Sequence, residues 1–96
     1  MQTQEITFVI ERIQQMEQYY DAVLQEVEKN VNELYGNAEI NKMIQELNEY
    51  MDSGLWLKDY ERDERGELPK GLKRGVLSED GLYNLLVTVH TSMSFS

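Results

Sequence analysis

Cysteine is absent from this 96-residue chain, and histidine and proline occur only once each. Without cysteine, neither a disulfide nor a thiolate zinc site can support so small a core, so stability must come from apolar packing or a partner chain. The single histidine, His90, leaves no multi-histidine metal site, and nothing around it indicates a hydrolytic triad. We therefore expect a protein that is not an enzyme and that binds neither a metal nor a cofactor.

Long apolar runs are missing as well. The apolar stretch at residues 6–10 is interrupted by Thr7 and is too short for a membrane span, and no basic leader of a signal peptide precedes it. The sequence therefore predicts a cytoplasmic protein that does not associate with membranes.

Basic residues are scarce, with nine Lys and Arg against 18 Asp and Glu and a net charge of −9. Most of the imbalance lies in residues 1–54, whereas residues 55–96 are nearly neutral. Such a surface repels phosphates, so direct binding of nucleic acid is not expected. An alternative interpretation is an acidic inhibitor that imitates nucleic acid by presenting rows of carboxylates.

The one acidic cluster with metal-like spacing is Asp59, Glu61 and Asp63, which would occupy positions 1, 3 and 5 of a calcium loop. Glu64 stands where that loop needs glycine, and Lys70 where it needs the bidentate glutamate. A salt-bridged helix surface is the better interpretation. A metal-dependent or small-molecule-binding protein is consequently the weakest alternative.

Apolar residues recur with a 3.5-residue period over residues 6–34, which predicts one long helix. Glu17 interrupts the stripe and argues against a regular parallel coiled coil. Asn37 can cap a second helix that ends at residues 52–54, so an antiparallel hairpin is expected. The apolar residues of that second helix are Ile40, Met43, Ile44, Leu47, Tyr50 and Met51.

The two predicted helices differ in length, roughly 45 Å against about 20 Å at the helical rise. The second helix therefore covers the first only back to about Tyr20. The stripe nearer the N-terminus needs another cover, either the last helix of the same chain or a second copy that makes a homodimer through Ile6, Ile10 and Ile13.

A short third helix is expected to begin after a cap at Ser53 and to end at Gly66. Residues 66–77 contain glycines and the only proline and should form a basic loop. Ser78 then caps the last helix, whose leucines, Leu82, Leu85 and Leu86, are the predicted lid over the uncovered stripe. We predict one domain over residues 1–91 and a frayed tail over residues 92–96.

Two features of the second half suggest contacts with a partner. Lys70, Lys73 and Arg74 form a basic patch that either receives an anionic group or, as we favour, offsets the acidic helices. Trp56 and Tyr60 share a helix face and serve either as an interface anchor or, more often in small domains, as core. Packing also leaves Tyr83 and Asn84 unexplained. The candidate partner-binding residues are therefore Trp56, Tyr60, Lys73, Arg74, Tyr83 and Asn84.

Residues 55–60, LWLKDY, and residues 72–86, LKRGVLSEDGLYNLL, resemble a family of small bacterial helical proteins classed as a domain of unknown function. The chain from Val87 onward looks like an addition to the family pattern. The resemblance implies a compact, helical, cytosolic protein and lends no activity. The sequence therefore predicts an all-α bundle with a long N-terminal hairpin, a short third helix, a basic loop and a C-terminal helix. Its expected role is non-enzymatic protein–protein interaction, in a homodimer or with another protein.

Overall fold

The computed structural model describes residues 2–30, 36–78 and 80–94. These residues form α1 (Gln2–Asn30), α2 (Ala38–Asp52), α3 (Leu55–Glu64), the short 3-10 helix η2 (Gly75–Leu77) and α4 (Gly81–Ser94), and they contain no strand. The predicted all-α bundle is confirmed. None of the described helices is long and apolar enough to cross a membrane.

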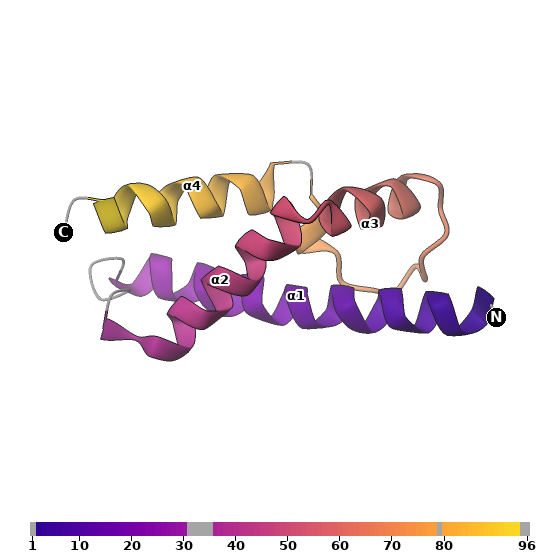
Figure 1. Cartoon of the computed structure of the whole chain (residues 1–96), viewed down its shortest axis with the longest axis horizontal. Helices are drawn as coiled ribbons and strands as arrows, with labels where there is room; N and C mark the ends of the chain where they lie inside the picture. Colours follow the sequence, from indigo (N-terminus) through magenta and orange to yellow (C-terminus); the bar gives the residue numbers. More distant parts are fainter. Residues whose placement is uncertain (1, 31–35, 79, 95–96) are drawn as a thin grey trace.

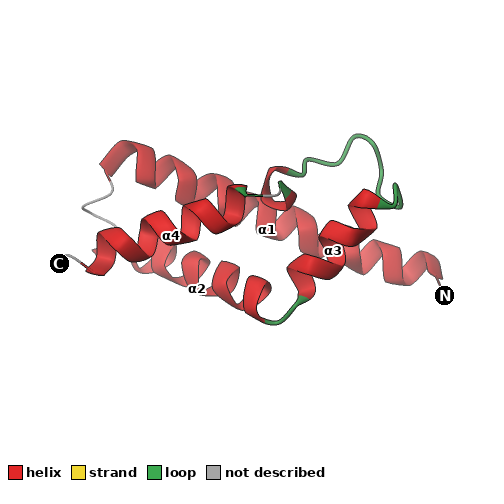
Figure 2. Ribbon diagram, turned by 90° about the horizontal axis from the view of Figure 1, so that it is seen from above, coloured by secondary structure: helices red, strands yellow, loops and turns green. Residues whose placement is uncertain are grey.

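The long helix α1 spans the molecule, which measures 47 × 24 × 22 Å (Figure 1). Helix α2 returns beside the C-terminal half of α1, and α3 continues along the N-terminal half. The chain then loops back to the middle, and α4 lies along α1 and α2 (Figure 2). The two halves of α1 are thus covered by different parts of the chain.

The hairpin begins as the sequence predicts. Asn37 is the N-cap of α2, and its side-chain oxygen accepts a hydrogen bond from the N–H of Ile40 at 3.1 Å. This bond satisfies one of the free amides that every helix start exposes. The predicted end of the first helix at Leu34 lies outside the described residues.

The turn between α2 and α3 differs in detail from the prediction. Gly54, not Ser53, is the N-cap residue of α3, because its φ of 87° is a left-handed conformation that glycine adopts without strain. The Ser53 hydroxyl still accepts the N–H of Leu55 at 3.3 Å. At the other end, Gly66 terminates α3 with a φ of 72°, as predicted.

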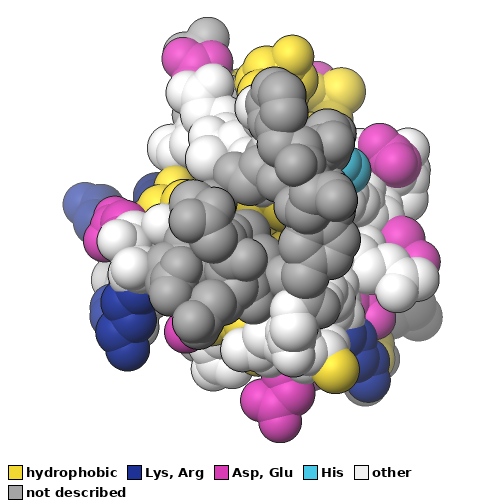
Figure 3. Space-filling model, turned by 90° about the vertical axis from the view of Figure 1, so that its left-hand side faces the viewer, with side chains coloured by type: hydrophobic (Ala, Val, Ile, Leu, Met, Phe, Trp, Pro, Cys, Tyr) yellow, Lys and Arg dark blue, Asp and Glu magenta, His cyan; other side chains and the backbone are white. Residues whose placement is uncertain are grey.

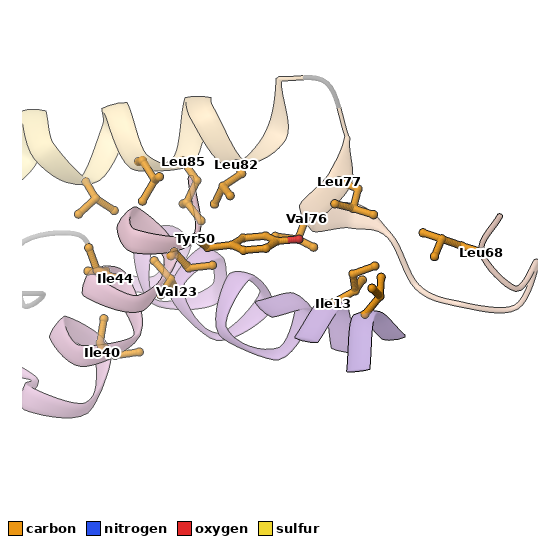
Figure 4. Close-up of a cluster of buried hydrophobic side chains, with 14 residues drawn as sticks. Ile13, Val23, Ile40, Ile44, Tyr50, Leu68, Val76, Leu77, Leu82 and Leu85 are labelled. Atoms are coloured by element: carbon orange, nitrogen blue, oxygen red, sulfur yellow. The ribbon is translucent and has the colours of Figure 1, made fainter. Parts of the chain in front are cut away.

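One apolar core runs through the bundle and takes residues from every helix except α3 (Figure 4). The buried hydrophobic residues are Val9, Ile13, Val23, Ile40, Ile44, Leu47, Tyr50, Leu68, Val76, Leu77, Leu82, Leu85, Leu86 and Val89.

The apolar side of the N-terminal half of α1, which includes Ile13, is not covered by the element that the sequence predicted. Figure 4 shows Leu68 and Leu77, from the loop and η2, on the side of Ile13, whereas Leu82 and Leu85 lie over the region of Val23. The loop is the lid, because α4 leaves η2 in the direction of the other end of α1. The prediction that the α4 leucines cover this stripe is therefore wrong.

This arrangement also changes the predicted dimer interface. Ile13 has 0% of its surface exposed, so a second copy cannot reach it. Ile6 and Ile10 are half-buried. A homodimer through Ile6, Ile10 and Ile13 together is inconsistent with this packing.

Helix α4 begins later and extends further than predicted. It starts at Gly81, and the hydroxyl of Ser78 donates to the carbonyl of Gly75 at 2.7 Å, closing η2. Its C-terminal end at Ser94 lies three residues inside the predicted tail. The β-branched residues do not stop it, because Val89 is fully buried and its packing outweighs the weak helix propensity.

Replacing Ile13 with alanine tests whether this residue of α1 is buried in the core. We expect Ile13→Ala to lower the free energy of unfolding by about 2–5 kcal/mol, because it leaves a cavity under η2. Urea denaturation followed by circular dichroism measures this. Phe8→Ala, on the same helix at a residue 68% exposed, should change stability by less than about 0.5 kcal/mol. Similar effects for both variants would contradict the packing.

Candidate functional site

A buried carboxylate joins three helices. Asp59 of α3 has no exposed surface, and Arg12 of α1 binds it through two hydrogen bonds, Nε to Oδ2 at 2.9 Å and Nη2 to Oδ1 at 2.5 Å. The hydroxyl of Tyr50, from α2, donates to Oδ2 at 2.6 Å. An ionised buried group needs such partners, since leaving it unpaired would cost several kcal/mol. Among the described residues, no buried side-chain nitrogen or oxygen lacks a hydrogen bond.

The same contacts fix the protonation of this network. Burial, followed by the hydrogen bond to Asp59, raises the pKa of Tyr50 well above its ordinary value. The hydrogen bond from Arg12 to Asp59 raises the pKa of the guanidinium. Tyr50 therefore stays neutral and Arg12 charged at physiological pH, as a structural clamp requires.

A second set of contacts holds η2 against α1. The Glu17 carboxylate accepts the N–H of Val76 at 2.7 Å, and the indole N–H of Trp56 donates to the carbonyl of Val76 at 2.8 Å. Gly75 leaves room for this carboxylate, because a Cβ there would lie 3.1 Å from Glu17 Oε2 and would press on it. Glu17 thus interrupts the apolar stripe of α1 in order to bind the loop backbone.

Arg74 is engaged within its own loop. It pairs with the carboxylate of Asp63, and its guanidinium donates to the carbonyls of Pro69 at 2.5 Å and Leu72 at 3.2 Å. These bonds shape residues 69–74 around one cation. A partner would have to compete with all of them to bind Arg74.

The aromatic pair of α3 is also partly internal. The rings of Trp56 and Tyr60 stack with centroids 5.1 Å apart and planes at 19°, and both residues are half-buried. Trp56 packs against the core and binds Val76. The pair therefore supports η2 more directly than it offers a free surface.

Lys73 lies at a polar cavity between α1 and the loop. The cavity has a volume of about 430 Å³ and is lined by Gln14, Glu17, Gln18, Asp21, Gly71, Leu72 and Lys73. Within residues 2–30, 36–78 and 80–94 no cluster of three His, Cys, Asp or Glu is placed to hold a metal ion.

The outer side of α4 has a different character from the other helices. From Gly81 to Ser94 the helix contains no Asp, Glu, Lys or Arg, although 28% of the chain is charged. Tyr83 is 62% exposed and Val87 44%. Figure 3 shows hydrophobic side chains gathered at the top of the molecule, at the level of α4. A helix that faced only water would carry charges on this side.

A shallow apolar groove lies between α4 and α1. Its volume is about 300 Å³, and its lining residues are Tyr20, Leu24, Val27, Gly81, Asn84, Leu85 and Thr88. Asn84 and Thr88 are exposed at its edge. We call the exposed residues Tyr83, Asn84, Val87, Thr88 and Thr91 the α4 face.

The structure separates the six candidate residues into three places: α3 beside η2, the loop, and the α4 face. Only Tyr83 and Asn84 come together on one exposed surface. Sequence reasoning missed Val87 and Thr88, the next turn of the same face. The absence of charge after Asp80 is the signal that could have found them.

The raised pKa of Tyr50 predicts how stability depends on pH. The unfolded chain releases the tyrosine proton near pH 10, while the folded protein keeps it to higher pH. The stabilisation is therefore complete below about pH 9 and is lost as the pH rises. Tyr50→Phe should lower the free energy of unfolding by about 1–3 kcal/mol at neutral pH. Between pH 7 and about pH 11 the variant should lose less of its free energy of unfolding than the wild type does.

Urea denaturation at the two pH values measures both effects. Tyr83→Phe is the matched control, because Tyr83 is exposed and should show the wild-type pH dependence. The same alkaline loss in Tyr50→Phe and wild type would contradict the role of Tyr50.

Replacing Glu17 tests how the loop is held. In Glu17→Ala the N–H of Val76 loses its acceptor, and its hydrogen exchange should accelerate by about ten- to a hundredfold. Amide exchange followed by NMR measures this. Glu11→Ala removes an equal charge from an exposed site on α1 and should leave Val76 unchanged. Unaltered exchange at Val76 in Glu17→Ala would rule out the anchor.

A match to a protein family extends over most of the chain. Residues 13–95 match the family described as Domain of unknown function (DUF4298). The match includes the whole of α4, so the expectation that residues from Val87 onward are an addition is wrong. No curated protein and no solved structure was found to match. With 83 of 96 residues inside the family model, the chain belongs to the domain family of unknown function DUF4298.

Proposed function

We propose that this chain is a non-enzymatic, cytoplasmic bacterial protein that acts by binding another protein chain on its α4 face. The observation that carries the proposal is the uncharged helix α4, with Tyr83 and Val87 exposed one turn apart. Exposed apolar side chains without charges between them are typical of the centre of protein interfaces.

The other large exposed hydrophobic residues support this choice of surface. Phe8 is 68% exposed and Leu57 52%, but each is surrounded by charge on its own helix. Glu11 lies one turn from Phe8, and Glu61 one turn from Leu57. Tyr83 has Asp80 one turn before it, whereas Val87 has no Asp, Glu, Lys or Arg one turn away. Charged residues are depleted in interface cores, so Phe8 and Leu57 fit a solvated surface better than Val87 does.

The groove beside α4 adds to the area available to a partner. A side chain that enters between α1 and α4 would contact Leu24, Val27 and Leu85. Anchors that fill such pockets contribute most of the binding energy in many interfaces. A partner bound here would therefore use α1 as well as α4.

The acidic-inhibitor alternative has one observation in its favour. Exposed carboxylates are present along α1 and α2, at Glu11, Glu28, Glu39, Glu49 and Asp52. The uncharged α4 face and the burial of Glu17 break the row that a nucleic-acid mimic needs. Failure to displace DNA from any binding protein in a fluorescence-polarisation assay would remove this alternative.

Site-specific cross-linking tests the proposed surface. A photoreactive amino acid at position 87 should capture a protein chain in the native host, whereas the same group at position 57 should not. The purified partner should then bind Val87→Glu at least about tenfold more weakly, because a carboxylate is placed in an apolar contact. Isothermal titration calorimetry measures the affinity.

Leu57→Glu is the matched control, since it makes the same chemical change at an exposed apolar residue on α3. It should bind the partner as tightly as wild type. Equal binding by Val87→Glu and wild type would show that the partner uses another surface.

A further inference from the structure

We infer that the chain bound on the α4 face is a second copy of this protein, so that two α4 helices pack against each other across a two-fold axis. This inference rests on the proposed function and names its partner. It replaces the dimer through Ile6, Ile10 and Ile13, because Ile13 is fully buried.

Electrostatics favours a like chain at this surface. Each copy carries a net charge of −9, so two copies repel wherever their carboxylates meet. The helices α1, α2 and α3 all contain acidic residues, whereas α4 contains none. Exposed Asp80 lies directly before α4, one turn from Tyr83, so the part of the α4 face around Val87 is where two copies can approach without placing like charges opposite one another.

The absence of acidic residues from α4 also argues against a basic partner at this helix. A different partner for so acidic a protein would be steered and held by charges at the rim of the interface. Helix α4 carries no Asp or Glu that the cations of such a partner could pair with, and the ring nitrogen of His90 lies 3.4 Å from Asn48 of α2. Homodimer interfaces are more apolar than those between different chains, which suits a face without charge.

The spacing of the exposed residues is compatible with two-fold symmetry. Tyr83, Val87 and Thr91 follow each other at intervals of four residues and lie on one side of α4. In a symmetric pair every contact occurs twice. A two-fold axis at Val87 sets the Val87 side chains of the two copies together and places Tyr83 of each copy against Thr91 of the other.

The size of the α4 face sets the affinity that we expect between the two copies. Fourteen residues of helix are about 21 Å long and roughly 10 Å wide, which is small beside the ~800 Å² per partner of standard interfaces. The groove against α1 enlarges the contact only in part. We therefore expect a weak dimer with a dissociation constant on the order of 100 µM.

Sedimentation velocity tests the inference on the full chain. The weight-average mass should rise from monomer toward dimer between about 10 and 1,000 µM. It should also rise when NaCl is increased from about 0.05 to 0.5 M, because salt screens the repulsion between the two acidic copies. Binding to a basic partner would show the opposite salt dependence. A strict monomer at the highest concentration and salt would overturn the inference.

Two substitutions on the α4 face and one control on α3 locate the interface. Val87→Glu places carboxylates opposite each other at the axis and should keep the protein monomeric, whereas Leu57→Glu, which adds the same charge on α3, should dimerise like wild type. Thr91→Glu provides a second variant on the α4 face with the same expectation as Val87→Glu. Equal dimerisation by all variants would place the contact elsewhere.

The results also separate this inference from the proposed function. A monomeric wild type whose cross-linked partner is a different protein, with binding lost in Val87→Glu, refutes the second copy and keeps the α4 face. A dimer that Val87→Glu leaves intact refutes the second copy on the α4 face, and the cross-linking from position 87 then decides the proposed function by itself.

Discussion

The buried carboxylate of Asp59 is the constraint on which the rest of the fold depends. Its two hydrogen bonds to Arg12 and one to Tyr50 fix α3 against α1 and α2. Because a shift that separated Arg12 from Asp59 would leave a buried carboxylate without its cation, these contacts favour one relative position of the three helices. That position brings Trp56 to the carbonyl of Val76, so that the loop can cover Ile13.

The elements that depend on local rules were predictable from the sequence. The apolar period, the Asn37 cap and the end of α3 at Gly66 each follow from residues close together in the chain. The segment that packs over the N-terminal half of α1 was not predictable, because its position depends on contacts between distant residues, such as Glu17 with Val76. Glu17 looked like an interruption of a stripe, and Asp59 like a solvated residue, until the partners across the fold were known.

The candidate site shows the same division. Tyr83 and Asn84 were found because packing did not explain them, and the structure leaves both exposed. Arg74 and Trp56 were chosen for residue types that serve interfaces, yet their hydrogen-bonding groups meet Asp63 and Val76 of the same chain. Residue type indicates what a side chain is able to bind, whereas the fold decides whether that capacity is already used.

The contact between Glu17 and Val76 also has a kinetic consequence. It joins residues 59 positions apart, whereas the α1–α2 hairpin is built from neighbouring segments. Since closing a long loop costs more chain entropy than closing a short one, the hairpin should form first and η2 should dock late. Helix α4 follows η2 directly, so it reaches its place only after that closure. Until then the uncharged segment of a newly made chain stays accessible, and folding and assembly compete for the same apolar residues.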